Sequence, residues 1–171
     1  MSSTKYFERR LNSLNMENAS WATRLQGLFT TLHSAAGNGR KDLAQLLIDG
    51  GADPNKTDKH GRTPLYCAAA KGHEDVVRLL MKAGADPNKG DKDNVIPLHI
   101  AITTLANPCY FLIKLLLDKG SDPNAMDKHG KTPLSRAMLR YPHRQYMVKI
   151  LLESGANPSE KEKEELRGWD F

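Results

Sequence analysis

The sequence has little of what disulfide scaffolds, metal centres and membrane proteins need. Two of its 171 residues are cysteines, and Cys67 and Cys109 lie far apart without a Cys-x-x-Cys pair. A disulfide framework is therefore not expected, and a reducing compartment is the simplest expectation. No apolar run is long enough to cross a membrane, and Met1–Leu14 lacks a secretory signal pattern. We expect a cytoplasmic protein, with the nucleus as an alternative.

Aromatic residues are also scarce, at 6% of the chain, and they do not alternate with its basic residues. A surface that stacks single-stranded nucleic acid needs such alternation, so its absence argues against that class of partner. The net charge of +5 favours an acidic partner but does not by itself imply nucleic acid. Direct binding to nucleic acid or anionic lipid stays an alternative, which a steep salt dependence would reveal.

Motifs for catalysis and cofactor binding are missing. Gly130–Thr132 matches the end of a phosphate-binding loop, but Ala125 stands where the motif needs its first glycine. Neither cysteine has a general base beside it in the sequence. The six histidines do not pair at metal-ligand spacing with cysteine or carboxylate. We expect no enzymatic activity, no cofactor and no metal.

What the sequence does contain is a repeated unit, and its clearest copy runs from Asp58 to Asn88. Asp58 and Gly61 suit the first and fourth positions of a type I turn. Thr63 can cap a first helix, and Gly84 is placed to end a second helix in the left-handed conformation. The unit is thus a turn followed by two antiparallel helices. It cannot bury its apolar stripe alone, so it needs neighbouring copies.

The copies recur in register. Leucines that begin equivalent helices are separated by 33, 33 and 36 residues: Leu32, Leu65, Leu98 and Leu134. Prolines that follow the second helices are separated by 33, 36 and 35 residues: Pro54, Pro87, Pro123 and Pro158. A period near 33 with Thr-Pro-Leu-His-x-Ala is the ankyrin signature. The motif stands here as Thr30-Thr31-Leu32-His33, Thr63-Pro64-Leu65, Ile96-Pro97-Leu98-His99 and Thr132-Pro133-Leu134-Ser135. Roughly residues 28–159 therefore resemble ankyrin repeats.

The resemblance implies an all-α ankyrin-repeat solenoid of stacked helix-turn-helix units with short β-turn or hairpin fingers. We divide the chain into an N-terminal helical cap, four repeats and a charged C-terminal helix or tail, at residues 1–27, 28–57, 58–90, 91–126, 127–159 and 160–171. Ser159 and Glu162 make a capping box, which predicts a last helix from Glu160 to about Arg167. Whether the two terminal segments only cap the array or also bind a partner stays open.

The third unit departs most from the pattern. Asn94 replaces the turn glycine, which is tolerable because asparagine visits the left-handed region. Ile96 replaces the capping threonine, and we expect this to cost about 1 kcal/mol locally. His33, His73 and His99 stand at motif positions, where the ankyrin family uses histidine for internal hydrogen bonds.

Ankyrin domains, as a family, bind other proteins through the fingertips and the exposed side of the first helices. The resemblance thus implies a monomeric, non-catalytic adaptor, inhibitor or targeting module. The candidate groove is mostly basic and would suit an acidic protein surface: Lys59, His60, Arg62, Lys71, Lys92, Asp93, Lys128, His129 and Lys131. Ordinary solvated lysines are the alternative. A small stand-alone array also fits a host-directed effector, or a protein similar to the ankyrin inhibitors of transcription factors.

Large side chains replace polar ones where the third and fourth units gain residues between their helices. Tyr110 and Phe111 stand where the second unit has Glu74 and Asp75. A second candidate patch therefore comprises Leu105, Tyr110, Phe111, Tyr141, His143 and Tyr146. These side chains either fold down over the longer connections, which is the more ordinary outcome, or form an exposed contact surface. The solvent exposure of Phe111 and Tyr146 decides between the two.

Overall fold

The structure is a computed structural model that describes residues 32–104, 110–139 and 144–169. The predicted N-terminal cap, Cys109, and the patch residues Leu105, Tyr141 and His143 lie outside these ranges. Within them the chain forms nine α-helices and no strand. The helices are α3 (Leu32–Gly37), α4 (Lys41–Asp49), α5 (Pro64–Lys71), α6 (Glu74–Lys82), α7 (Pro97–Thr104), α8 (Tyr110–Asp118), α9 (Pro133–Met138), α10 (Arg144–Glu153) and α11 (Glu160–Leu166).

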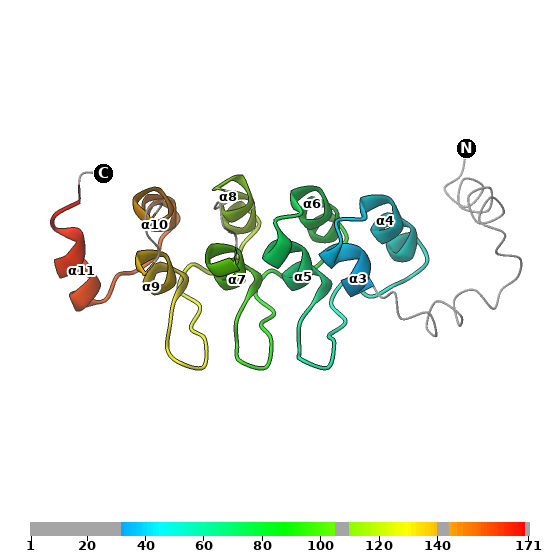
Figure 1. Cartoon of the computed structure of the whole chain (residues 1–171), viewed down its shortest axis with the longest axis horizontal. Helices are drawn as coiled ribbons and strands as arrows, with labels where there is room; N and C mark the ends of the chain where they lie inside the picture. Colours follow the sequence, from blue (N-terminus) through cyan, green and yellow to red (C-terminus); the bar gives the residue numbers. More distant parts are fainter. Residues whose placement is uncertain (1–31, 105–109, 140–143, 170–171) are drawn as a thin grey trace, which may run out of the picture.

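The helices form two rows that run along the molecule (Figure 1). The inner row is α3, α5, α7 and α9, in which each helix packs against the next, and the outer row is α4, α6, α8 and α10. Three looped fingers project from the side of the inner row, and α11 closes the C-terminal end of the stack. The all-α repeat array predicted from the sequence is therefore confirmed. Among the helices described, none combines the length and apolar character needed to cross a membrane.

Local chemistry explains where the inner helices begin. The hydroxyl of Thr63 accepts a hydrogen bond from the Tyr66 N–H at 3.1 Å, and proline at the next position needs no donor there. Thr132 repeats this arrangement in α9, where the Ser135 hydroxyl oxygen also accepts a hydrogen bond from the Thr132 N–H at 2.9 Å. In the third unit Asn94 does adopt the left-handed conformation, with φ of 57°. The predicted capping role of Thr63 and the predicted left-handed conformation of Asn94 are both confirmed.

The core runs along the stack between the two rows. Leu65 and Leu98 are fully buried, as predicted, and so are Leu80, Leu116 and Leu151 from the outer helices. Small alanines of the motif, such as Ala68 and Ala69, are also fully buried and let the inner helices approach closely. The array thus buries an apolar stripe that one unit alone would leave in water.

Asparagine side chains join successive units just before the fingers. The Asn55 side chain donates to the Gly84 carbonyl at 2.9 Å and accepts from the Asp86 N–H at 2.7 Å. Asn88 and Asn124 repeat both bonds to the following units. In the last unit Ser159 takes this position, and its hydroxyl caps α11 with Glu162. The predicted capping box is confirmed, and Leu166 and Trp169 pack back against the core.

Candidate partner-binding surface

Each finger is held by one aspartate at its base. Asp58 accepts hydrogen bonds from the N–H groups of His60 at 2.8 Å and Arg62 at 2.9 Å. Asp91 and Asp127 make the same pair of bonds in the next two fingers, at 2.8 to 3.0 Å. Because one carboxylate organises each turn, equivalent residues occupy equivalent places at the three fingertips.

Neighbouring fingers are also bonded to one another. The Lys92 N–H donates to the His60 carbonyl at 3.1 Å, and the Lys128 N–H donates to the Asp93 carbonyl at 2.9 Å. Gly61 lies at the first of these contacts, where an added Cβ would come within 2.9 Å of the Lys92 nitrogen. Position 61 therefore needs glycine for two reasons: its φ of 82° is unfavourable for other residues, and the two backbones approach too closely for a Cβ atom. These contacts bring the fingertips predicted from the sequence into one row.

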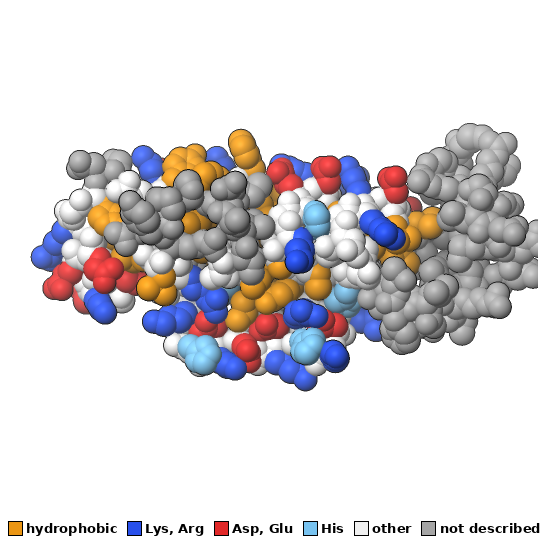
Figure 2. All heavy atoms as spheres, in the orientation of Figure 1, with side chains coloured by type: hydrophobic (Ala, Val, Ile, Leu, Met, Phe, Trp, Pro, Cys, Tyr) orange, Lys and Arg blue, Asp and Glu red, His pale blue; other side chains and the backbone are white. Residues whose placement is uncertain are grey.

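Several charges in this row are already paired. Arg62 forms an ion pair with Asp58 of its own finger at 2.7 Å, and Lys128 forms one with Asp93 of the preceding finger at 2.7 Å. Within the described ranges, the ion pairs do not include Lys59, Lys92 or Lys131, and all three side chains are exposed. Figure 2 shows basic, acidic and histidine side chains mixed along the finger edge.

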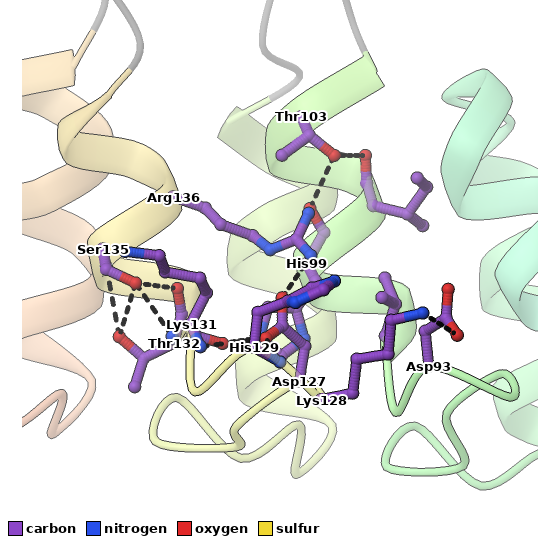
Figure 3. A network of polar contacts seen from close by, with 12 residues as sticks. Asp93, His99, Thr103, Asp127, Lys128, His129, Lys131, Thr132, Ser135 and Arg136 are labelled. Atoms are coloured by element: carbon purple, nitrogen blue, oxygen red, sulfur yellow. Dashed lines mark hydrogen bonds and ion pairs between the residues drawn. The ribbon is translucent and has the colours of Figure 1, made fainter.

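Two of the base aspartates, Asp58 and Asp127, stay ionised to low pH because their pKa values are lowered. Burial alone would raise the pKa of Asp127, but the hydrogen bonds from the Lys131 N–H, the Arg136 guanidinium and the His129 N–H lower it to about 2. Asp58 is similar: burial opposes ionisation, and hydrogen bonds from Arg62 and the His60 N–H lower its pKa to about 2. Figure 3 shows Arg136 and Asp127 side by side beneath α7. This ion pair lies away from solvent, since the Asp127 side chain is 1% exposed.

The motif histidines make internal hydrogen bonds between units. His33 bonds to the Arg62 carbonyl at 2.9 Å and His73 to the Gly37 carbonyl at 3.1 Å. His99 bonds to the Lys131 carbonyl at 3.0 Å, while its other ring nitrogen accepts from the Ile96 N–H at 3.3 Å. A carbonyl oxygen can only accept, so His99 is neutral with its proton on Nε2. Burial lowers the pKa of His99, which agrees with this state.

A family model that describes ankyrin repeats in three copies matches residues 11–91 and 83–162. The chain belongs to the ankyrin-repeat family. Ankyrin repeats generally mediate protein–protein interaction, which is the role that the resemblance of the repeat motifs implied. No curated protein matches the chain.

The described part of this ankyrin array offers little to catalysis. Burial raises the pKa of the Cys67 thiol, which is the opposite of what a nucleophile needs. Among the residues that the structure describes, no three histidine, cysteine or carboxylate side chains are grouped to hold a metal ion.

The remaining groove residues of the ankyrin array are exposed as well. His60, His129 and Lys71 all face solvent, with Lys71 in the last turn of α5. Sequence reasoning missed two members of this surface, Arg136 and Met126. Arg136 stands where the other inner helices have Ser34, Cys67 and Ile100. Because none of these is basic, the pattern of the other units does not predict an ion pair with Asp127. Met126, at the base of the last finger, is 65% exposed.

Of the second patch, the structure describes Tyr110, Phe111 and Tyr146, and the last two are exposed to solvent. Phe111 is 76% exposed and Tyr146 is 54% exposed, so the expectation that these side chains fold down over the connections is wrong for both. They protrude because they occupy the outward positions of α8 and α10, while the next two residues of each helix are buried. The Tyr110 and Tyr146 rings meet edge to face with centroids 4.4 Å apart, which joins α8 to α10. Leu139, at the end of α9, is 79% exposed.

Proposed function

We propose that this ankyrin array is a non-catalytic module that binds an acidic surface of another protein through its fingertips. One observation carries the proposal: each of the three fingers presents one exposed lysine outside the ion pairs of the described residues, namely Lys59, Lys92 and Lys131. We call these three residues the finger lysines. Backbone hydrogen bonds join each finger to the next, which supports their acting together; Lys59 and Lys92 directly follow the base aspartates, and Lys131 lies four residues after Asp127.

The other basic residues of the fingers contribute less in this proposal. Arg62 and Lys128 already neutralise Asp58 and Asp93, so a partner would have to compete with those carboxylates. The carboxylate of Asp93 also interrupts the row of positive charge. A phosphate backbone needs a continuous basic track, so this mixed row favours a protein surface over nucleic acid.

Each exposed charge pair contributes only about 0.2–1 kcal/mol, so the finger lysines must act together. Their effect should fall mainly on the association rate and on its dependence on salt. The triple variant Lys59→Glu, Lys92→Glu and Lys131→Glu reverses all three charges without breaking any ion pair described above. We expect it to weaken the partner complex at least tenfold, about 1.4 kcal/mol, and to flatten its salt dependence.

The test captures partners from lysate with an amine-reactive cross-linker, which reports directly on lysines. The matched control is Lys82→Glu, Lys119→Glu and Lys161→Glu, which makes the same change of charge at exposed sites outside the fingers. We expect cross-links at the finger lysines, loss of the partner in the finger variant and its retention in the control. Equal capture by the two variants would contradict the proposal, and capture of nucleic acid alone would replace it with the nucleic-acid alternative.

A further inference from the structure

Among the residues that the structure describes, three of the four exposed large hydrophobic side chains lie at helix ends on the other side of the molecule from the fingers. Phe111 and Tyr146 lie in the first turns of α8 and α10, and Leu139 is the residue that follows the last turn of α9. Figure 2 shows hydrophobic side chains at the surface near the outer helices α8 and α10. We call Tyr110, Phe111, Leu139 and Tyr146 the outer aromatic patch.

The patch belongs to the third and fourth repeats alone. At the position of Phe111 and Tyr146, the first two repeats have Asp42 and Asp75, both exposed. The ankyrin fold therefore does not need an aromatic residue there. The edge-to-face contact of Tyr110 with Tyr146 fixes one side of the patch, because Tyr110 is itself partly buried against the core. Phe111 and Leu139 gain no comparable burial from the array.

The charge beside the patch is positive. Lys114 and Lys149 follow Phe111 and Tyr146 by three residues, which places them on the same helix faces. The carboxylates on those faces, Asp118 and Glu153, lie seven residues from the aromatic rings, about 10 Å along each helix. On the side of α6, Asp75 is paired with Lys41 at 3.8 Å and Glu74 with Arg78 at 2.5 Å.

The starts of the two helices add to this positive field. Neither α8 nor α10 has an acidic residue in its first turn, whereas α4 has Asp42 and α6 has Glu74 and Asp75. The N-terminal end of a helix favours negative charge through its dipole and its unpaired N–H groups. In the first two repeats the chain's own carboxylates supply that charge. In the third and fourth repeats a bound partner could supply it.

We propose that the outer aromatic patch binds an acidic, amphipathic segment of a partner protein. Apolar side chains of that segment cover Phe111 and Leu139, and its carboxylates lie against Lys114, Lys149 and the first turns of α8 and α10. Rigid aromatic anchors with a charged border are typical of the residues that dominate binding energy in interfaces. The inference does not depend on the finger lysines, which lie on another surface.

Charge argues against a second copy of the chain as the occupant, and the small apolar area of the patch argues against a membrane. A second copy of the chain, related by two-fold symmetry, would bring Lys114 and Lys149 of both copies together and create repulsion. Interfacial membrane binding grows with the apolar area buried, and in the described residues this patch has three exposed large hydrophobic side chains, Phe111, Leu139 and Tyr146. Both occupants are nevertheless outcomes of the experiment below.

The probe is a random 16-residue peptide library displayed on phage and selected on the full chain. Phages that bind the Phe111→Asp variant are removed first. This variant gives the third repeat the residue that the second has in Asp75, and an acidic residue in a first turn suits folding. We expect the enriched peptides to combine Asp or Glu with Leu, Phe or Trp. Synthetic copies should lose at least tenfold in affinity on Phe111→Asp and on Lys114→Glu with Lys149→Glu.

Two variants serve as controls for those affinities. Met126→Asp makes the same kind of change at an exposed hydrophobic residue near the fingers, and the triple variant of the finger lysines alters the other surface. Both should bind the peptides as the parent does. Loss of binding in the finger variant alone would assign the peptides to the finger row and overturn this inference. Its failure would therefore be distinguishable from failure of the proposed function.

The remaining outcomes also overturn the inference. If no enriched peptide distinguishes the parent from Phe111→Asp, the proposed docking site is not there. A dimer in light scattering that Phe111→Asp converts to a monomer would make a second copy the occupant. Sedimentation with vesicles of 70% phosphatidylcholine and 30% phosphatidylserine, lost in Phe111→Asp, would make a membrane the occupant.

Discussion

Single residues of the repeat are interpretable against their equivalents in the neighbouring units, and Ser121 shows this most clearly. The other units have alanine at this position, Ala52, Ala85 and Ala156, directly before the Asp or Asn that opens the next turn. Ser121 is 3% exposed, and its hydroxyl has no hydrogen-bond partner in the described part of the chain. A buried polar group without a partner costs about 1–3 kcal/mol.

We therefore predict that Ser121→Ala stabilises the protein by about 1 kcal/mol, because the change removes an unsatisfied hydroxyl and adds no volume. Urea unfolding followed by circular dichroism measures the effect as a higher midpoint with an unchanged slope. Ser154→Ala, at an exposed serine after α10, is the control and should stay within about 0.5 kcal/mol of the parent. A loss of stability in Ser121→Ala would mean that the hydroxyl has a partner after all.

At the scale of one element, the finger is a turn whose stability depends on an ionised aspartate. The folded pKa of Asp127 is about 2, below its ordinary value of 3.8. A group whose pKa is lowered by folding contributes stability above its unfolded pKa, and that contribution is lost as pH falls through the folded pKa. The finger should therefore hold at neutral pH and weaken between about pH 4 and pH 2, the interval between these two pKa values.

The predicted size of this effect for Asp127 is about 2 kcal/mol, because a pKa lowered from 3.8 to about 2 corresponds to roughly 1.4 kcal/mol per pKa unit. Asp127→Asn keeps an oxygen for the two backbone N–H groups but removes the charge that Arg136 neutralises. Urea unfolding at a series of pH values should show that the variant loses less stability than the parent between about pH 4 and pH 2. His99 affects stability in a different pH range. Because folding lowers its pKa, the free energy of unfolding falls as pH drops below about 6.5. Identical acid profiles for parent and variant would contradict the assignment.

The sequence predicts the parts of each element better than the contacts between elements. The Asp-x-x-Gly turns, the Thr63 cap and the burial of Leu65 follow from local chemistry, and the structure confirms them. The pairing of Lys128 with Asp93 cannot be predicted from local sequence, because the two residues are 35 positions apart. They come together only because two neighbouring units stack. For the same reason the candidate groove looked like a mostly basic surface in the sequence, whereas Arg62 and Lys128 are already paired with carboxylates in the structure.

The exposure of the outer aromatic patch illustrates the same limit. Periodicity alone places Phe111 on α8, but the third repeat departs from the regular length just before that helix. The direction of an outward side chain then depends on how the next repeat packs. The contact of Tyr110 with Tyr146 across two units therefore needed the structure.

At the scale of the whole molecule, stability comes from contacts between neighbouring units. The inner helices pack in the order α3, α5, α7 and α9, and each asparagine side chain reaches only the following unit. The core is continuous along the described part of the stack, but the main helix contacts that build it join neighbouring units. A defect in one unit should therefore weaken that unit and its neighbours more than the distant end.

Leu98→Ala tests this arrangement, because Leu98 is fully buried in α7, between α5 and α9. Removing the side chain should cost about 2–5 kcal/mol, from lost burial and the cavity that remains. Hydrogen exchange measured by mass spectrometry should show faster exchange in α7 and α9, with a smaller change in α3. The control is Leu139→Ala, an exposed leucine, which should leave exchange unchanged in all units. Equal acceleration from α3 to α10 would show that the array unfolds as one cooperative unit, and stability within about 1 kcal/mol of the parent would mean that the predicted register of the third repeat is wrong.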